Sequence, residues 1–461
     1  ARGGRALLVG GSVRDFLMGK ISKDFDMEIY GLEAEMIRDI VAEHGKVEEV
    51  GMAFGVLKVM FTDGIDIDVS LPRKDSKTGE GHKGFNVETD PNMSIEEAAR
   101  RRDFTFNSIC ADPMTGELYD PFGGAKDIRD GVLKVTDQEL FKDDPLRVLR
   151  AMQFIGRFEF TIDSGSEAVL KEMVPLLKEL PKERLLEEWR KLLLKSHRPS
   201  NGLEAARELG VIEGLHPELH ALVGTEQEYE WHPEGDVWVH TLMVVDQAAQ
   251  LARDNDLDPD AAFVQLLTAV THDTGKPSTT KFLDGRIRSR GHEEAGEEPT
   301  KAFLASLGVD KLTTKKVVKL TTHHLKPTIL YLSEQKSKKP LKDGTIRRLA
   351  KSLHPATIRE LVMAARADHF GRDSVGEPIT EFPGGDWLLE RARRLEIQDR
   401  RPSSLTKGRD WIKLGYKPGI QLGRLINLAN ELRDEKEYAK QMVLDAVEGI
   451  DDTEKAADHL E

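Results

Sequence analysis

The sequence predicts a multidomain protein in which an α+β domain with a mostly antiparallel sheet precedes a long all-α region. The first observation is length, because 461 residues exceed what one hydrophobic core can organise. The second is that short β-type runs, separated by turns and single helical stretches, are confined to about the first 135 residues. The third is that helical periodicity dominates the rest. We expect a head, a helical neck, a further helical domain and a helical tail, at 1–136, 137–227, 228–372 and 373–461.

The individual elements follow from the period of the apolar residues. Strand-like runs of the head lie at 6–9, 25–30, 55–61 and 65–70. Helical patterns beyond the head lie at 145–158, 166–180, 183–194, 237–253 and 261–270. Polar segments, or segments rich in glycine and proline, indicate candidate boundaries at 196–201, 224–235 and 371–386.

Composition narrows the class of protein. With 39% hydrophobic and 32% charged residues the chain is typical of a globular protein, and no apolar run approaches the roughly 18 residues that span a bilayer. We therefore expect a cytoplasmic protein without a membrane partner. The single cysteine, Cys110, excludes an internal disulfide and a cysteine-rich zinc module, so any metal must be held by histidines and carboxylates. A net charge of -14 argues against a general cationic coat for nucleic acid, so RNA binding must be local and DNA is not an expected partner.

The first chemical motif is a glycine turn between a strand and a helix, in LLVGGSVRDFLMG. Ser12 is the expected N-cap, with Asp15 three residues later as in a capping box, so the amides of Gly10 and Gly11 would face outward at a helix start. Such amides bind phosphate, and Arg14 would add a charged donor toward a triphosphate. A tight strand-to-helix turn requires glycine without any ligand, so this structural explanation stays open for the motif alone.

A pair of carboxylates follows in KDFDMEIYG. Asp24 and Asp26 are two residues apart in a strand-like run, so both side chains project from one face and can share magnesium ions. Nucleotidyl transfer requires such an arrangement, because one metal ion activates the attacking hydroxyl while another neutralises charge on the triphosphate. Asp66 and Asp68 share a face of another strand-like run, and either could complete the metal site. An edge strand with a solvated acidic face explains each pair equally well when it is considered alone.

Two arginine-containing segments supply donors for a nucleotide. RRDFTFN concentrates two arginines and Asp103 at the start of an element, and DDPLRVLRAMQF places Asp144, Arg147 and Arg150 at helical spacing. Asp144 and Arg147 are three residues apart on one helix face, so together they offer an acceptor and a planar set of donors for the Watson–Crick edge of a base. A capped helix with an ordinary ion pair is the alternative for this segment.

Taken in order, GGSVRD, DFD, RRDFTFN, DDPLRVLRAMQF and PKERLLEEWRKLL resemble the motifs of the class II tRNA nucleotidyltransferase and bacterial poly(A) polymerase family, with matching spacing across residues 7–195. The resemblance implies a nucleotidyltransferase head of the DNA polymerase β type that uses Mg²⁺. It implies Asp24 and Asp26 as metal ligands and Asp68 as the third carboxylate. It assigns nucleotide binding to Gly11, Arg14, Arg102, Asp103, Asp144, Arg147 and Arg150, and base reading to Asp144 with Arg147. Where the family often has a further arginine, one turn after Arg150, this chain has Gln153.

Histidines cluster in the region 228–372. A lone helix histidine such as His240 is usually packed or solvated, but HDTGKP follows an apolar helix that would bury the adjacent His272 and Asp273. A buried pair of this kind requires a partner, for which a divalent metal is suited. The series resembles the HD phosphohydrolase superfamily, which implies a divalent transition metal such as Ni²⁺ or Mn²⁺ at this site. The implied ligands are His240, His272, Asp273 and Asp368, with His292 and His323 or His324 nearby.

Together the two resemblances imply an enzyme that adds CCA to tRNA 3′ ends from CTP and ATP, with an accessory phosphohydrolase for 2′,3′-cyclic phosphates or 2′-nucleotides. Enzymes that add only A or only CC, and a poly(A) polymerase, share the head and stay open as alternatives. The complete set of carboxylates and arginines disfavours a hydrolase with a relic head and an RNA-binding module without catalysis. The stretch 334–351 carries seven Lys or Arg against two acids, which indicates a solvated face or an RNA contact.

Overall fold

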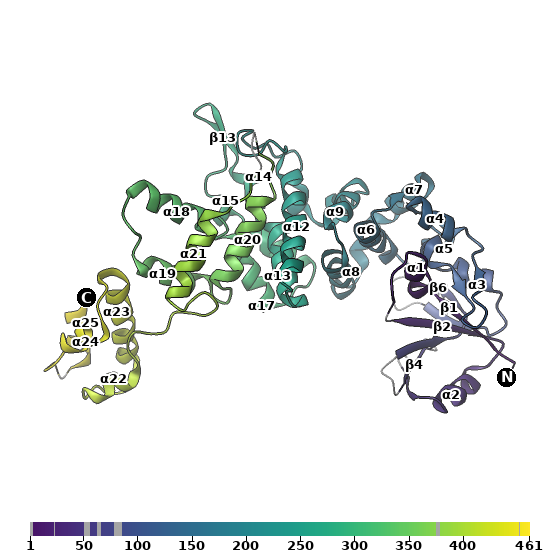
Figure 1. The fold of residues 1–461 in the computed structure, drawn as a ribbon, viewed down its shortest axis with the longest axis horizontal. Helices are drawn as coiled ribbons and strands as arrows, with labels where there is room; N and C mark the ends of the chain where they lie inside the picture. Colours follow the sequence, from purple (N-terminus) through teal and green to yellow (C-terminus); the bar gives the residue numbers. More distant parts are fainter. Residues whose placement is uncertain are drawn as a thin grey trace. The chain divides into compact units, whose positions relative to one another are not determined.

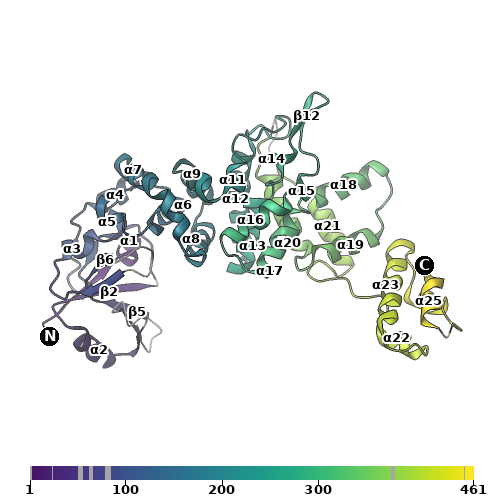
Figure 2. The same ribbon diagram turned by 180° about the vertical axis from the view of Figure 1, so that it is seen from behind.

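The computed structural model describes residues 3–22, 24–49, 56–61, 66–77, 85–374, 379–450 and 452–461. The chain divides into two compact units, Ala1–His216 and Pro217–Glu461. The first contains a large sheet, and the second is built almost entirely of helices (Figures 1 and 2). The expected division into four parts is finer than these two units and stays a proposal.

The first unit is organised around a seven-stranded sheet with the strand order β3-β4-β5-β2-β1-β8-β9. Its strands are β1 (Arg5–Val9), β2 (Phe25–Tyr30), β3 (Lys46–Glu49), β4 (Val56–Met60), β5 (Asp66–Ser70), β8 (Cys110–Ala111) and β9 (Leu118–Tyr119). In the described part of the sheet, β2 and β5 run parallel and the other neighbouring pairs run antiparallel, which confirms the expected mostly antiparallel sheet. A separate hairpin pairs β6 (Arg73–Lys77) with β7 (Phe85–Thr89). Positions 55 and 65 of the expected runs lie outside the described residues.

Apolar side chains pack on both faces of this sheet. On one face Val9 of β1 belongs to a buried cluster with Ala98 of α3 (Ile95–Arg100). On the other face Val69 of β5 packs with Ile37 of α2 (Ala34–Ala42). Asp26 is directly opposite Val9 in the β1–β2 register, and directly opposed side chains lie on the same face. Asp26 therefore projects on the face away from α2.

Helix α1 (Gly11–Leu17) begins earlier than the sequence predicts. Its N-cap is Gly10, whose φ of 67° is a conformation that residues with a Cβ rarely adopt. Ser12 therefore lies inside the first turn, where its hydroxyl donates to the Val9 carbonyl at 3.1 Å, and no side-chain capping bond forms. The expected N-cap at Ser12 with a capping box is wrong, because glycine at position 10 lets the chain enter the helix two residues sooner.

The remaining helices of the first unit follow the sheet in the chain. They are α4 (Gly124–Asp130), α5 (Gln138–Phe141), α6 (Leu146–Phe158), α7 (Ser164–Met173), α8 (Lys182–Lys195), α9 (Pro199–Glu208) and α10 (Val211–Leu215), with the 3-10 turns η1 (Thr105–Asn107) and η2 (Val174–Glu179) and the short strand pair β10 (Val132–Leu133) and β11 (Thr161–Ile162). Helices α8 and α9 pack on α6. The rings of Phe104 and Phe106 meet Phe154 edge to face, with centroids 5.8 and 5.3 Å apart. These contacts fix the RRDFTFN segment beside α6.

The second unit is almost all helical, as expected. Its helices are α11 (Pro217–His220), α12 (Val237–Asp254), α13 (Pro259–Thr271), α14 (Lys276–Thr279), α15 (His292–Ala295), α16 (Glu297–Ser306), α17 (Lys311–Thr321), α18 (Lys326–Ser337), α19 (Asp343–Leu353), α20 (Ile358–Phe370), α21 (Pro383–Arg394), α22 (Gly408–Lys413), α23 (Ile420–Lys436), α24 (Lys440–Asp445) and α25 (Thr453–Leu460). A hairpin of β12 (Lys281–Leu283) and β13 (Arg286–Arg288) interrupts them. Its turn residues Asp284 and Gly285 both have positive φ, as a tight hairpin turn requires. The hairpin was not expected, although an Asp-Gly pair is a strong hairpin signal.

Helix α13 lies at the centre of the second unit and carries the HD pair into the interior. Asp258 caps it by accepting from the Asp260 and Ala261 amides, and 10 of its 13 residues are buried. Helices α12, α17 and α20 pack around it. His272 and Asp273 follow directly after its last residue, so the burial of α13 delivers both side chains into the core.

The four helices α22–α25 have a core of their own around Trp411 and Leu425. The Trp411 indole donates to the Thr406 hydroxyl at 2.9 Å, and both groups are buried. Among the described residues, no helix is both long enough and apolar enough to cross a membrane.

Candidate functional site

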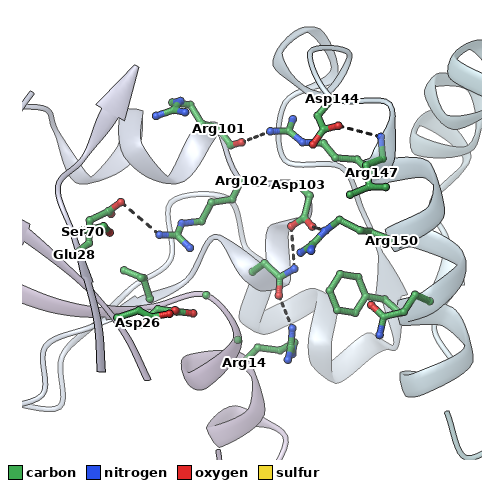
Figure 3. Close-up of a pocket in the computed structure, with 18 of the residues that line it drawn as sticks. Arg14, Asp26, Glu28, Ser70, Arg101, Arg102, Asp103, Asp144, Arg147 and Arg150 are labelled. Carbon is green, nitrogen blue, oxygen red and sulfur yellow. Dashed lines mark hydrogen bonds and ion pairs between the residues drawn. The ribbon is translucent and has the colours of Figure 1, made fainter. Parts of the chain in front are cut away.

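A cavity of about 700 Å³ in the first unit collects most of the residues that the sequence singled out. The glycine turn at Gly10 and Gly11 lines it. Its acids come mainly from strands, and its cations come mainly from helices (Figure 3). The charged lining residues are Asp26, Glu28, Asp68, Asp103, Asp144, Arg14, Arg73, Arg101, Arg102, Arg147, Arg150, Arg157, Arg184, Lys191 and Lys195. Ten cations face five acids, which favours a polyanionic ligand.

The sheet wall of the cavity presents two facing carboxylates. Asp26 of β2 is directly opposite Asp68 of the parallel strand β5, so both side chains point into the same space. Partial desolvation by the cavity walls raises the pKa of Asp26, although its side chain is exposed in the open cavity; Arg102 opposes this rise, and the nearby charges of Asp68 and Asp24 add to it. Repelling carboxylates of this kind fit a divalent cation, which would replace their repulsion by attraction. Asp66, the other candidate, instead forms an ion pair with Lys58 at 3.1 Å.

Asp24 occupies a different place from its partner in the DFD motif. It lies one residue before β2 and is not among the described residues that line the cavity, although both aspartates are exposed. Its charge nevertheless contributes to the raised pKa of Asp26, so the two carboxylates are near one another. The structure thus brings Asp24, Asp26 and Asp68 into one neighbourhood, with Asp26 between the other two.

The glycine turn lets an arginine approach the acidic wall. A Cβ at Gly10 would lie 3.0 Å from Nη1 of Arg102, tighter than ordinary contact. Arg102 also forms a 3.6 Å ion pair with the buried Glu28, on the same strand as Asp26. At the other end of the turn, Arg14 is buried, donates to Asn107 at 2.8 Å, and stacks on a phenylalanine ring. Both arginines therefore have fixed orientations at the helix start.

Asp103 is buried and orients Arg150 toward the cavity (Figure 3). Its Oδ2 accepts from Nε of Arg150 at 2.6 Å, and its Oδ1 accepts from Asn107 and from the Phe104 amide. Although burial raises the pKa of the Asp103 carboxyl, the Arg150 guanidinium and the Asn107 amide lower it below its usual value. Asp103 thus acts through Arg150 rather than as an open acceptor for a ligand.

Asp144 and Arg147 both line the cavity, but the expectation that they share one helix face is wrong. Helix α6 begins at Leu146, and Asp144 precedes it and accepts from the Leu146 amide at 3.1 Å. The reason is Pro145, because the residue before a proline is disfavoured in helical conformation. Asp144 pairs with Arg184 of α8 at 3.0 Å, while Arg147 donates to the carbonyls of Leu140 and Arg101.

Several lining residues were missed from the sequence. Arg184, Lys191 and Lys195 line the cavity from α8, where spacings of seven and four residues place them on one face. That periodicity within PKERLLEEWRKLLLK was an available signal.

Gln153 also lines the cavity, and its buried Nε2 has no hydrogen-bond partner among the described residues. A buried donor without a partner there fits a ligand that brings an acceptor.

The second unit contains a compact cluster of histidines and carboxylates. Nε2 of His240 (α12) lies 3.1 Å from Oδ1 of Asp368 (α20) and 3.8 Å from Oδ2 of Asp273. Nε2 of His272 lies 3.2 Å from the same Asp273 oxygen and 3.9 Å from Asp368. All four implied ligands therefore converge from three helix ends. His240, His272 and Asp273 are almost completely buried.

Hydrogen bonds orient the imidazoles of this cluster. Nδ1 of His272 lies 2.8 Å from the Ala269 carbonyl, and Nδ1 of His240 lies 2.9 Å from Glu234. Since a carbonyl can only accept, Nδ1 of His272 carries the proton and its Nε2 lone pair is left for another partner. Nε2 of His272 and Oδ1 of Asp273 are buried without a hydrogen-bond partner in the described structure, while Oδ2 of Asp273 forms an ion pair with Lys276. Orphaned atoms of these types, aimed at one point, fit a divalent metal.

Charges around the cluster hold its carboxylates ionised. Burial raises the pKa of Asp273, but the His272 imidazole and the Lys276 ammonium, 2.6 Å away, hold that pKa well below its usual range. Burial likewise opposes ionisation of Asp368, and its hydrogen bond from His240 keeps its pKa well below the usual range. The ligand carboxylates are therefore in the form that a metal requires.

Further histidines line a cavity of about 220 Å³ beside the cluster. His292 and His324 both place Nε2 within 4 Å of Oδ1 of Asp273. His323 instead bonds the Ser352 hydroxyl through Nε2, so His324 is the nearby member of the histidine pair. Glu234 is a site residue that the sequence did not predict, although it follows a His-Pro step only six residues before His240.

Three family models match successive parts of the chain. The model described as the poly A polymerase head domain matches residues 6–134. The model described as the probable RNA and SrmB-binding site of polymerase A matches residues 159–223, and the HD domain model matches residues 237–373. Head domains of this type and HD domains use divalent metals, and the cluster around Asp273 offers groups that could hold one.

Curated relatives match most of the chain. The multifunctional CCA protein of Stenotrophomonas maltophilia strain K279a is 34% identical over 404 residues, covering 85% of this chain and 92% of the relative. The protein of the same name from Xanthomonas campestris pv. campestris strain B100 is 34% identical over 403 residues, covering 85% and 91%.

Solved structures share the fold. The Bacillus stearothermophilus CCA-adding enzyme in complex with CTP matches with a TM-score of 0.63 at 21% identity, over 94% of this chain and 90% of that one. The Thermotoga maritima CCA-adding enzyme complexed with tRNA matches with a TM-score of 0.59 at 19% identity, over 99% and 92%. At these identities the similarity shows a common fold.

Proposed function

The chain belongs to the family of multifunctional CCA proteins, and we propose that it adds C, C and A to the 3′ end of tRNA from CTP and ATP without a template. The observation that carries this proposal is the cavity of the first unit, which joins facing carboxylates to an excess of cations. The names of the relatives support complete CCA addition over the alternatives, which were addition of A alone, addition of CC, and poly(A) synthesis. A cytoplasmic location, where tRNA is processed, is part of the proposal.

The residues of the cavity divide the work of nucleotidyl transfer. When Mg²⁺ is bound at Asp24, Asp26 and Asp68, it supplies the charge stabilisation that a pentavalent phosphate requires. The amides at the Gly11 helix start and the guanidinium of Arg150 bind the triphosphate. The 3′ hydroxyl of the tRNA loses its proton to solvent and its oxygen forms a bond to the α-phosphorus. The bond from the α-phosphorus to the α,β-bridging oxygen breaks, and pyrophosphate leaves toward the cationic wall.

Asp144 and Arg147, at the start of α6, select the base of the nucleotide. Asp144 offers a carboxylate and Arg147 a planar guanidinium, the acceptor and donors that the Watson–Crick edges of C and A require. Arg184 holds Asp144, and two backbone carbonyls hold Arg147, so the pair is oriented before a nucleotide binds. A pre-oriented pair can discriminate without a template base.

The decisive experiment offers tRNAs that end before CCA, after C or after CC, with CTP, ATP or both, and measures product length. We expect CTP alone to extend the first substrate by two residues, and ATP to add one residue only after CC. Products that stop at CC in the presence of both nucleotides, or that grow into an A tail, would assign the chain to one of the alternatives.

Arg147→Ala should change the ratio of C to A incorporation more than it changes tRNA affinity.

A second activity is favoured by the buried cluster around Asp273. We infer that the second unit is a phosphohydrolase that acts on 2′,3′-cyclic phosphate or 2′-nucleotide ends, as repair before CCA addition would require. A divalent transition metal such as Ni²⁺ or Mn²⁺, held by His240, His272, Asp273 and Asp368, supplies an acidic water and polarises the ester. Lys276 and Arg372, which line the adjacent cavity, provide positive charge for the phosphate.

Hydrolysis and addition can be separated on one preparation. Asp273→Asn should abolish hydrolysis of 2′,3′-cyclic AMP and leave addition to tRNA largely intact, because the two sites lie in separate units. Wild-type protein that hydrolyses no such ester with added Ni²⁺, Mn²⁺, Co²⁺ or Mg²⁺ would reduce the cluster to a structural role.

The four-part division, with a neck at 137–227 that binds RNA and a tail from residue 373, belongs to the same proposal.

A further inference from the structure

Trp231 is an exposed aromatic residue at the cavity beside the HD cluster. It is 56% exposed, whereas Trp189, Trp238 and Trp411 are at most 3% exposed, and it lines the 220 Å³ cavity together with Asp273. A large apolar ring left in solvent at a cavity indicates a binding surface more often than an accident of packing.

Contacts of the residues just before Trp231 fix its segment. The Trp231 amide donates to the Glu228 carbonyl at 3.0 Å, and the Glu228 carboxylate accepts from the Ile287 amide at 2.8 Å. Next to it, Glu230 forms a 3.0 Å ion pair with Arg286. The turn is thus tied to strand β13, whose Ile287 lines the same cavity. The ring is exposed although its backbone is held, so it is ready to bind a ligand with little loss of entropy.

The cavity changes character along its length. Its inner end has Asp273 and His292 with the positive charge of Lys276, and its outer part has Trp231 and Ile287. A nucleotide has the same sequence of chemical groups, from a charged phosphate through a polar ribose to a flat aromatic base. Base stacking on an exposed tryptophan is a common way to bind single-stranded nucleic acid.

We propose that Trp231 stacks on the base of the nucleotide whose phosphate lies at the HD cluster, with Ile287 beside it. The inference rests on the hydrolase activity proposed for this unit and adds the residue that would bind the base of its nucleotide substrate. Stacking uses the face of the base, which all four bases share. The site therefore accepts any terminal base, as repair of damaged ends requires.

The kinetic test compares 2′,3′-cyclic AMP with its base-free counterpart, the 2′,3′-cyclic phosphate of methyl riboside. We expect the wild type to prefer the nucleotide in kcat/KM by about fivefold or more, mainly through KM. Trp231→Ala should bring the ratio close to one with kcat nearly unchanged, and Trp231→Phe should keep most of it. Tyr229→Ala is the matched control, because this residue is 69% exposed in the same segment but is not among the described lining residues. A Trp231→Ala protein that keeps the wild-type ratio, or loses both substrates equally, would overturn the proposal.

A binding measurement separates this proposal from the hydrolase activity itself. The fluorescence of the full chain is titrated with 2′-AMP and with ribose 2-phosphate, and the signal of Trp231→Phe is subtracted. Quenching by 2′-AMP alone supports stacking even if no ester is hydrolysed. Equal signals from both compounds, or no difference between wild type and Trp231→Phe, would overturn stacking even if hydrolysis is found.

Discussion

The two sites of this chain arrange acids and cations in opposite ways. In the first unit Asp26 and Asp68 face each other across neighbouring strands, and partial desolvation together with their mutual repulsion raises the pKa of Asp26. In the second unit Asp273 is enclosed by imidazoles and Lys276, which hold its pKa well below the usual range despite burial. The first site is an open cavity of about 700 Å³, whereas His240, His272 and Asp273 of the second site are almost fully buried.

This difference in charge and burial indicates how each site obtains its metal ion. In the described structure Arg102 offsets only part of the effects that raise the pKa of Asp26, so the carboxylates of the first unit favour ions that enter with the triphosphate. The cluster of the second unit is closed and its imidazoles are oriented by hydrogen bonds, so it favours an ion that stays with the protein. We therefore expect the first site to exchange its metal ions with solvent and the second site to retain its metal ion.

The largest expected effect is on addition when the facing carboxylates are changed. Asp26→Asn keeps the shape but removes a charged oxygen, and we expect addition to fall by at least about 10³-fold, since metal stabilisation of the transition state is worth several kcal/mol. Hydrolysis of 2′,3′-cyclic AMP should stay at the wild-type rate. The two activities are measured on the same preparation; a similar loss of both would show that the sites are coupled.

Stability should respond to the same two carboxylates with opposite signs. The folded-state pKa of Asp26 is above 3.8, so its ionisation destabilises the folded chain as pH rises through that range, and Asp26→Asn should raise the Tm slightly at pH 7. The folded-state pKa of Asp273 is below 3.8, so its charge stabilises the folded chain at pH 7 and that stability is lost as pH falls. Asp273→Asn should therefore cost about 3 kcal/mol. Calorimetry in chelator tests both, and a lower Tm for Asp26→Asn would contradict the repulsion between the facing carboxylates.

The positioning role of Asp103 gives an intermediate effect. Asp103→Asn weakens the hold on Arg150 without emptying the space, and we expect kcat/KM for CTP and ATP to fall by about 30-fold, equivalent to about 2 kcal/mol. The exposed pair of Asp130 with Lys126 is the matched control, since Asp130→Asn should change nothing measurable. A loss confined to one nucleotide would assign Asp103 to base reading instead.

The fold class and most site residues could be predicted from the sequence, because short periodic runs and charged motifs are local signals. The start of α1 could not, since a positive φ at Gly10 depends on a backbone choice that the capping pattern of Ser12 contradicts. The partners of Asp144 could not either, because Arg184 comes from a distant helix. Anchors such as Glu234, which orients His240, become visible only when the loop is placed against the helix.

The smallest expected effect concerns Gln153. Its Nε2 is buried at the cavity without a partner in the described structure, so a bound nucleotide can accept from it. Gln153→Ala should raise KM for CTP and ATP by about threefold with kcat unchanged, the size of one neutral hydrogen bond. Unchanged KM values would show that this position, often arginine in the family, has no part in nucleotide binding here.

Metal content tests most directly whether one site exchanges its ion and the other retains it. The full chain and its Asp26→Asn and Asp273→Asn variants are purified without added metal, passed through gel filtration, and measured by inductively coupled plasma mass spectrometry. We expect about one divalent transition metal ion per chain in the wild type and in Asp26→Asn, and its loss in Asp273→Asn. A wild type that retains no ion, or an ion lost with Asp26→Asn but kept with Asp273→Asn, would contradict the assignment of retention to the second unit.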